Sequence, residues 1–321
     1  MVSVLSRCKG IGEPTASHVP LHFRSSFGRR TPRSMRRALD GMTDPQVANW
    51  QYLGATFKSE NNPDSREAQG MTTDGSRWYL CSNGSKRIIV FDDDWNRVVT
   101  ISPTSTIWDA WWNDPNRSTP ADEWGPGQKN PHLGALCIHE NILYIPIQGP
   151  RGVWRLNLTS AEQSWLHPSK LPDGDLFPWV SIHPVTGLLY TSNYHTPDVL
   201  HAYDRSGQNT LQYVKEHNIP LAKTDIYLDY VQGGVFTDCG RIILVRHDYN
   251  AIFCFSSLNG HFFGSRKIGT DDWDEAESVT VRPWQFQGNL ASVHVFELDN
   301  DATDLDDCYL RCFAIPDPSK L

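Results

Sequence analysis

The chain has 321 residues, 39% of them hydrophobic, and its formal net charge at pH 7 is −8. This acidic balance argues against nucleic-acid binding, which needs a basic face, and no apolar run is long enough for a membrane-spanning helix. Tryptophan is abundant, with 12 residues, and its large amphipathic ring suits contact with flat or apolar ligands. The composition therefore directs attention to small-molecule ligands.

The first 45 residues differ from the rest of the chain in kind. They are rich in arginine and serine and lack the continuous apolar segment of a secretory signal. We expect a disordered basic leader over 1–45, with a transit peptide as the alternative, and a single folded domain over 46–321. The seven cysteines show no CxxC spacing, and their odd number favours a reduced, intracellular protein. A disulfide between Cys308 and Cys312 and secretion, suggested by three glycosylation tripeptides, stay open.

From Glu67 onward one pattern recurs: a short apolar strand, a Gly or Asn turn, a second strand, a polar link and a third strand. Five copies are visible, and they begin at Gln69, Leu133, Trp179, Val231 and Glu277. A sheet of this kind cannot bury both faces alone, so copies must pack around a ring. The sequence therefore predicts an all-β fold, a single β-propeller with five blades, or six if a degenerate copy is hidden.

Further strands are expected between and before the copies. Arg97–Ile101 and Gly260–Ile268 are read as fourth, outermost strands. Trp50–Phe57 precedes the first copy and is predicted to complete the last blade, because closing the ring removes exposed strand edges.

Polar residues recur where the innermost strand of each copy begins. Aligning the copies by their first turn gives one column of Glu67, His132, Trp179, Gln232 and Glu275, and a second, two residues on, of Gln69, Gly134, Ser181, Gly234 and Glu277. Innermost strands line a propeller's channel, so both columns should converge there. The residue types differ from copy to copy, which favours one asymmetric site over a water-filled shaft that polar groups merely solvate.

Tryptophans gather in the longest segment between copies. Thr104–Asn130 holds Trp108, Trp111, Trp112 and Trp124, and a long aromatic loop leading into the His132 strand is a candidate lid. The alternative is that its rings pack against the sides of the blades. A second acidic and aromatic loop carries Trp273 to the same end of the fifth copy.

Other chemistries find less support. Asp92–Asp94 and Asp299–Asp301 superficially suggest calcium loops, but they follow third strands, where aspartate commonly caps turns, and neither has EF-hand spacing; we expect no metal. No GxSxG motif or Gly-rich phosphate loop is present. Glu67 with Glu275 or Glu277 offers a carboxylate pair of the kind that glycosidases use, if their separation permits.

Several phrases also carry a resemblance: PHLGALCIHENILYIPIQG, WVSIHPVTGLLYTSNY, VQGGVFTDCGRIILV and HVFELDND. They resemble a family of bacterial and fungal propellers and are similar, within it, to the fungal hetero-Diels–Alderases of tropolone sesquiterpenoid biosynthesis. The resemblance covers about Val47 to Pro316, rests on blade motifs rather than a catalytic signature, and leaves the basic leader out.

The resemblance implies a pericyclase of secondary metabolism that needs no cofactor. It would join a tropolone-derived ortho-quinone methide to a humulene-type terpene, holding the partners together and donating a hydrogen bond to the diene carbonyl. We expect catalytic roles for His132 and Gln232 as donors and for Glu67 and Glu277 as acid or base. Substrate contacts are expected from Trp179, Trp273, Trp111, Trp112 and Gln69.

Two rival classes stay open beside this enzyme. A carbohydrate-binding propeller would stack tryptophan on sugar rings, but it should repeat its site in every blade. A protein-interaction scaffold would favour broad exposed patches.

Overall fold

The computed structural model divides the chain into two units, Met1–Thr43 and Asp44–Leu321. The structure describes residues 51–59, 67–113, 131–148, 151–172, 177–224, 228–238, 240–247, 250–268, 274–283, 291–299 and 307–314, all in the second unit. Within these residues no helix is long and apolar enough to cross a membrane.

Almost all regular structure in the second unit is antiparallel strand. The first two copies of the repeat give β2 (Ala68–Thr73), β3 (Trp78–Ser82), β4 (Arg87–Phe91), β5 (Arg97–Ile101), β6 (Cys137–His139), β7 (Ile142–Ile147), β8 (Gly152–Asn157) and β9 (Gln163–Pro168). The third and fourth give β10 (Ser181–Ile182), β11 (Leu189–Ser192), β12 (Val199–Asp204), β13 (Thr210–Tyr213), β14 (Ile219–Pro220), β15 (Val231–Phe236), β16 (Arg241–Arg246), β17 (Ala251–Ser256) and β18 (Phe262–Lys267). The last copy gives β19 (Asp274–Pro283), β20 (Ala291–Asp299) and β21 (Asp307–Ala314), and β1 (Gln51–Ser59) precedes them all.

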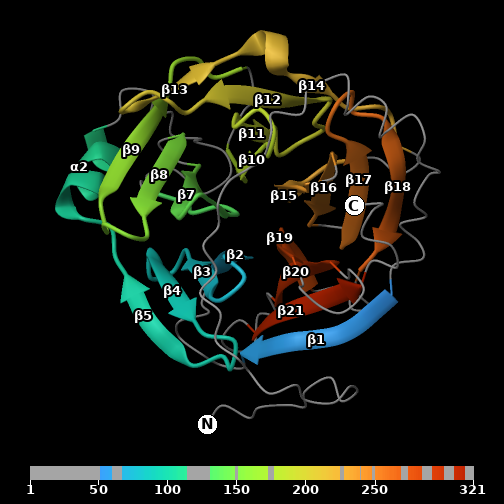
Figure 1. Ribbon diagram of the computed structural model, residues 1–321, viewed down its shortest axis with the longest axis horizontal. Helices are drawn as coiled ribbons and strands as arrows, with labels where there is room; N and C mark the ends of the chain where they lie inside the picture. Colours follow the sequence, from blue (N-terminus) through green and yellow to red (C-terminus); the bar gives the residue numbers. More distant parts are fainter. Residues whose placement is uncertain are drawn as a thin grey trace, which may run out of the picture. The chain divides into compact units, whose positions relative to one another are not determined.

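These strands form four hydrogen-bonded sheets around a common centre (Figure 1). Three are four-stranded, and the fourth combines the units β6–β9 and β10–β13 through a parallel pairing of β9 with β13. The innermost strands contact one another in the order β2, β6, β10, β15, β19 and back to β2. The predicted propeller is confirmed; the number of blades, five, stays a prediction, because two of the units share one sheet.

The N-terminal strand closes the ring, as the sequence predicted. β1 pairs antiparallel with β21 from Gln51 opposite Ala314 to Ser59 opposite Cys308, so the outer edge of the last sheet is supplied by the start of the chain (Figure 1). The expected outer strands are present as β5 and β18. No disulfide joins Cys308 to Cys312, and both side chains are buried.

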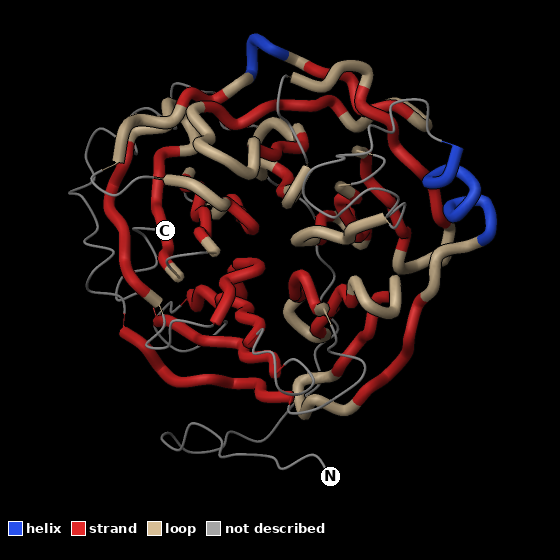
Figure 2. Tube along the Cα trace, turned by 180° about the vertical axis from the view of Figure 1, so that it is seen from behind, coloured by secondary structure: helices blue, strands red, loops and turns tan. Residues whose placement is uncertain are grey.

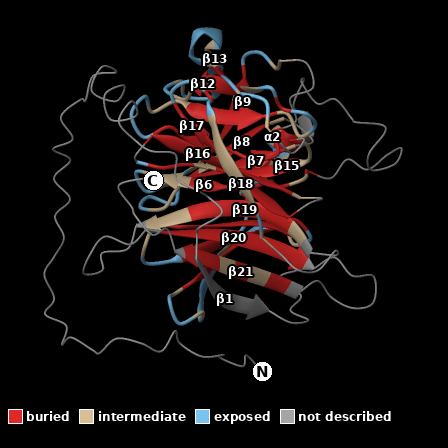
Figure 3. Cartoon of the chain, turned by 90° about the vertical axis from the view of Figure 1, so that its right-hand side faces the viewer, coloured by how far each residue is buried: buried red, intermediate tan, exposed pale blue. Residues whose placement is uncertain are grey.

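The core lies between neighbouring sheets, which explains why most strands are buried on both faces (Figure 3). One cluster joins Tyr79 and Ile88 of the first sheet to Leu143 and Trp154 of the next, and similar clusters fill the other gaps. Burying one such large side chain contributes about 1.5–3 kcal/mol, so the ring is held by the contacts between blades.

One helix interrupts the strands. α2 (Ser105–Asn113) lies outside the ring beside β9 (Figure 2), in the segment expected to be a lid. Thr104 caps it, since the Ile107 and Trp108 amides donate to its hydroxyl and carbonyl oxygens. A short 3₁₀ helix, η2 (Lys215–His217), also lies at the periphery.

Candidate active site

One edge of the ring gathers the chemically active side chains. In an antiparallel unit the first strand begins where the second ends and the third begins. We call this the entry edge, defined by the starts of β2, β15 and β19 and the ends of β3 and β16. The inner strands of neighbouring sheets begin at the same height along the ring axis, because Gly70 lies against Ala135 and Ser278, and Gly233 lies against Ser278.

Three inner strands carry a β-bulge at the same place. Ala68 pairs with Ser82 and Gly70 with Cys81, so Gln69 has no partner in the ladder. The same shift skips Gln232 in β15 and Glu277 in β19. A bulge re-aims the extra side chain. All three residues are buried or nearly so, and the bulges therefore place an amide, a second amide and a carboxyl group at one level of the ring.

The observed strand register corrects the alignment of the fourth repeat copy with the other copies. The column expected at the strand starts paired Gln232 with Glu67 and Glu275, but the bulges align Gln232 with Gln69 and Glu277. Tyr230 takes the place beside Glu67, and both residues adopt left-handed φ angles of 49°. The fourth copy was shifted by two residues because its two adjacent glycines hid the bulge.

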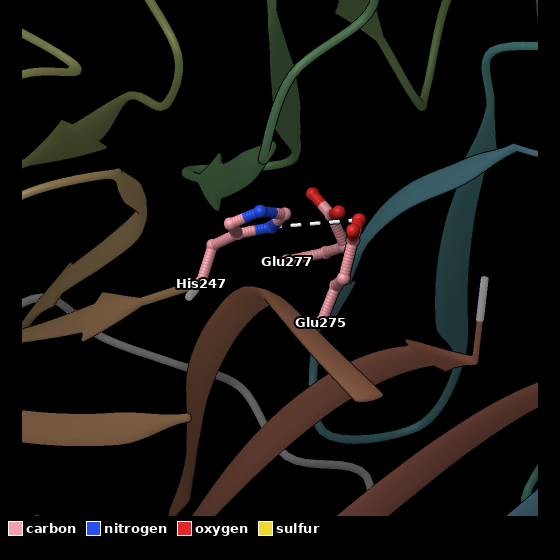
Figure 4. Close-up of side chains that lie close together, drawn as sticks. All are labelled: His247, Glu275 and Glu277. Carbon is pink, nitrogen blue, oxygen red and sulfur yellow. Dashed lines mark ion pairs between the residues drawn. The ribbon is translucent and has the colours of Figure 1, made fainter. Parts of the chain in front are cut away.

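Glu277 forms the centre of an acidic group (Figure 4). Its side chain is 1% exposed, and its Oε2 atom has no hydrogen-bond partner. Burial raises the pKa of Glu277 well above its ordinary value, and the charge of Glu275 and a hydrogen bond with that side chain add to the rise. Glu275 lies nearer solvent, with its Oε2 3.4 Å from His247 Nδ1. The three side chains can hold and pass a proton.

A second polar network surrounds His132. The Asn83 amide nitrogen lies 3.1 Å from His132 Nδ1 and donates to Glu67 Oε2 at 3.1 Å. Because that amide nitrogen can only donate, Nδ1 accepts, and Nε2 donates to Gln69 Oε1 at 2.9 Å. Burial, with the nearby charge of Lys86, lowers the pKa of His132 to about 3. The neutral imidazole therefore links Asn83 to Gln69.

Lys86 belongs to the same network and donates to Asn83 Oδ1. Burial lowers its pKa to about 8, against the opposing effect of the Glu67 carboxylate. The structure thus brings together Glu67, Gln69 and His132, which the sequence had placed in one channel, and adds Asn83 and Lys86, which it had not.

An aromatic group adjoins the carboxyl pair. Tyr194 and Tyr230 are half-buried and His195 is exposed. Their ring centroids lie 5.3 Å apart for the two tyrosines and 4.8 Å from His195 to each of them. Tyr230 also lies 6.2 Å from His247. Sequence reasoning missed this group, although each member stands directly after a second strand or before an inner strand.

The two expected tryptophans whose side chains the structure describes, Trp179 and Trp111, do not line the entry edge. Trp179 is fully buried, donates to Ser192 Oγ at 2.9 Å and packs where Gly234 leaves room. Its ring has no exposed face on which a ligand could stack. The sequence placed it in a column of strand starts, but packing between blades takes the whole ring.

The expected substrate contact by Trp111 is wrong for the same reason. This side chain is 1% exposed and packs edge-on against Trp108, Trp154 and Trp165, so α2 is fixed to the outside of a blade. This is the alternative that the sequence left open for the lid. The side chain of Trp112 and all of Trp273 lie outside the described residues.

The aspartate cluster at the end of β4 behaves as a turn. Asp92 accepts from the amides of Asp94 and Asn96, which matches the interpretation of a capping residue. Asp299–Asp301 falls largely outside the described residues.

Comparison with known proteins gives the fold. No known protein family and no curated protein sequence matches the chain. Glutaminyl cyclase from Myxococcus xanthus matches with a TM-score of 0.52 at 9% identity, over 81% of this chain and 96% of that one. A luciferin-regenerating enzyme has a TM-score of 0.41 at 11% identity, covering 77% and 91%. A chain of a nidogen/laminin complex has 0.42 at 12%, covering 73% and 76%.

The solved structures that it resembles are β-propellers. Two of the three carry the names of enzymes. At these identities the likeness shows the fold alone, and nothing in it indicates a hetero-Diels–Alderase.

Proposed function

We propose that this chain is an enzyme acting on small aromatic molecules, with the Glu275–Glu277 pair as its acid and base. The observation that carries the proposal is the geometry of the pair: a buried carboxyl group is hydrogen-bonded to a second one that reaches toward solvent. Two carboxylates form such a bond only when they share a proton. A group of this kind can give and take protons in one site.

The reaction that we propose is the one implied by the family resemblance. A hydroxymethyl tropolone loses water to give an ortho-quinone methide, which then adds across an alkene of a humulene-type terpene. Glu277 gives its proton to the leaving hydroxyl group, and Glu275 takes the proton of the ring hydroxyl. Water leaves, and the proton returns from Glu275 to Glu277 along their hydrogen bond, so the pair is restored.

The surrounding side chains supply the other requirements. Tyr194, Tyr230 and His195 offer flat, partly exposed rings beside the pair, on which a tropolone can stack. Gln232, turned inward by its bulge, supplies an amide donor for the diene carbonyl. His132, with both ring nitrogens hydrogen-bonded, orients Gln69 instead of donating to substrate. Holding both partners in register contributes several kcal/mol to lowering the barrier.

The test is product formation by the purified chain. The protein is incubated with a hydroxymethyl tropolone and humulene, and cycloadduct and water adduct are measured by chiral liquid chromatography with mass spectrometry. We expect one dominant enantiomer from the wild type, a loss of about 100-fold or more in rate for Glu277→Gln, and no loss for the exposed His261→Gln control.

Racemic product at the background rate, or full activity of a folded Glu277→Gln variant, would overturn the proposal. Retention of rate with loss of enantioselectivity would also count against it, because it would separate the carboxyl pair from catalysis.

A further inference from the structure

The acidic group has the composition of a metal site as well as that of a proton donor. His247, Glu275 and Glu277 each offer one ligand atom, and these atoms lie within 4.8 Å of one another. His247 directly follows β16, the second strand of its sheet, whereas Glu275 and Glu277 lie at the start of the inner strand β19 of the adjacent sheet, and the three side chains point toward one another (Figure 4).

Glu277 supplies an independent observation that points to a ligand. Its Oε2 atom is buried and accepts no hydrogen bond, and the adjacent His247 Nδ1 atom makes no hydrogen bond beside its 3.4 Å ion pair with Glu275 Oε2. A buried carboxyl oxygen without a partner destabilises the folded state. Because the side chain is 99% buried and directed into the group, a cation placed between the three residues would satisfy both atoms at once.

We propose that His247, Glu275 and Glu277 bind one divalent transition-metal ion of the Zn²⁺ or Mn²⁺ type. One imidazole with two carboxylates is a donor set that these ions accept, at metal–ligand distances of about 2.0–2.2 Å. Ligand atoms around a tetrahedral ion with these bond lengths lie about 3.3–3.6 Å apart, so side-chain rotations that bring the atoms together by about 1 Å suffice. Three protein ligands leave a coordination position open.

The position of the site decides what the ion does to the proposed reaction. Glu275 and Glu277 are the residues to which that reaction assigns proton transfer, and a bound cation takes the same oxygens. The ion therefore inhibits the acid–base step, and the entry edge binds either a cation or the proton that the reaction needs. The inhibition rests on the proposed function, whereas the cation site does not.

The sequence analysis did not predict this metal site, because the candidate metal ligands that it weighed were aspartate runs. His247 and Glu277 lie 30 positions apart in the printed sequence and meet through the contact of β15 and β16 with β19. Only the inward turn of the bulge brings Glu277 to the imidazole.

Isothermal titration calorimetry with Zn²⁺ tests the binding directly. The full chain is treated with EDTA, dialysed into buffer with a non-thiol reductant, and titrated at pH 7. We expect one ion per chain, with affinity reduced at least tenfold in Glu277→Gln and in His247→Gln and unchanged in His261→Gln. Circular dichroism checks that each variant is folded. Mn²⁺, which thiols bind poorly, is titrated as a second probe by electron paramagnetic resonance.

No saturable binding by the wild type, or binding that survives Glu277→Gln together with His247→Gln, would overturn the site. The effect of Zn²⁺ on product formation then separates the two proposals. Binding with inhibition supports both, whereas binding without inhibition leaves the cation site intact and refutes the role of the carboxyl pair in the reaction.

Discussion

Replacing Glu277 with glutamine is expected to stabilise the protein increasingly as the pH rises. The folded state holds this carboxyl group protonated because of burial and the neighbouring Glu275, whereas in the unfolded chain it ionises around its ordinary pKa of 4.5. Above that pH the unfolded state binds fewer protons than the folded state, so the free energy of unfolding falls as pH increases. Glutamine has nearly the same shape and does not titrate.

The size of the effect follows from the linkage. While the folded group stays protonated, each pH unit above 4.5 removes up to about 1.4 kcal/mol from the wild type. Between pH 5.0 and 6.5 the stability of the variant relative to the wild type should therefore rise, by at most about 1.4 kcal/mol per pH unit. Every other titrating group is present in both proteins and largely cancels in this difference.

Urea denaturation of the two proteins at pH 5.0, 5.5, 6.0 and 6.5 measures this difference, with EDTA present to keep the site free of metal ions. Conservative Glu275→Gln serves as a comparison that leaves the buried carboxyl group in place. A stability difference that stays constant over the four pH values would refute the protonated state of Glu277, and with it the acid that the reaction requires.

Three further changes test the packing of the ring. Burial lowers the pKa of His294 from 6.5 to about 3, so below pH 6.5 the unfolded state binds a proton that the folded state does not. Lowering the pH from 6 to 5 should therefore reduce the free energy of unfolding of the wild type by about 1 kcal/mol more than that of His294→Gln, as measured by urea denaturation. An equal reduction in the two proteins would contradict this. Gly134→Ala would place a Cβ atom 2.1 Å from the Pro178 carbonyl oxygen and should cost about 3 kcal/mol in the same assay; a loss below about 1 kcal/mol would show that the backbone yields. Ser192→Ala leaves the buried indole N–H of Trp179 without an acceptor and should cost about 1–3 kcal/mol, with Ser192→Thr as the variant that keeps the oxygen.

The strands could be predicted because each copy of the repeat contains recognisable turn residues between short apolar segments. Asp74–Gly75 and Thr186–Gly187 mark the turn between the first and second strands of two copies. The lone strand before the repeat could cover an exposed strand edge only by pairing with the last blade. The outcome was the pairing of β1 with β21. Position within the repeat was also enough to bring Glu67 to the entry edge.

The site was harder to predict, for physical reasons. A bulge shifts the facing of a strand by one residue, and nothing in the letters around Gln232 distinguishes it from regular pairing. His247 and Tyr194 follow second strands, whose ends meet the inner strands only in three dimensions. The prediction for Trp179 was wrong because a large ring at the start of an inner strand can point into the channel or between two blades. The space that Gly234 leaves allows the second orientation.

Closure of the ring also sets the order in which the last sheet can form. β1 is made first and β21 last, and the sheet that they share includes β19, which carries Glu275 and Glu277. A nascent chain emerging from the ribosome therefore cannot complete this sheet until β21 has been translated, and such distant pairing is slow. Glu275 and Glu277 therefore reach their final surroundings only when β21 joins the sheet.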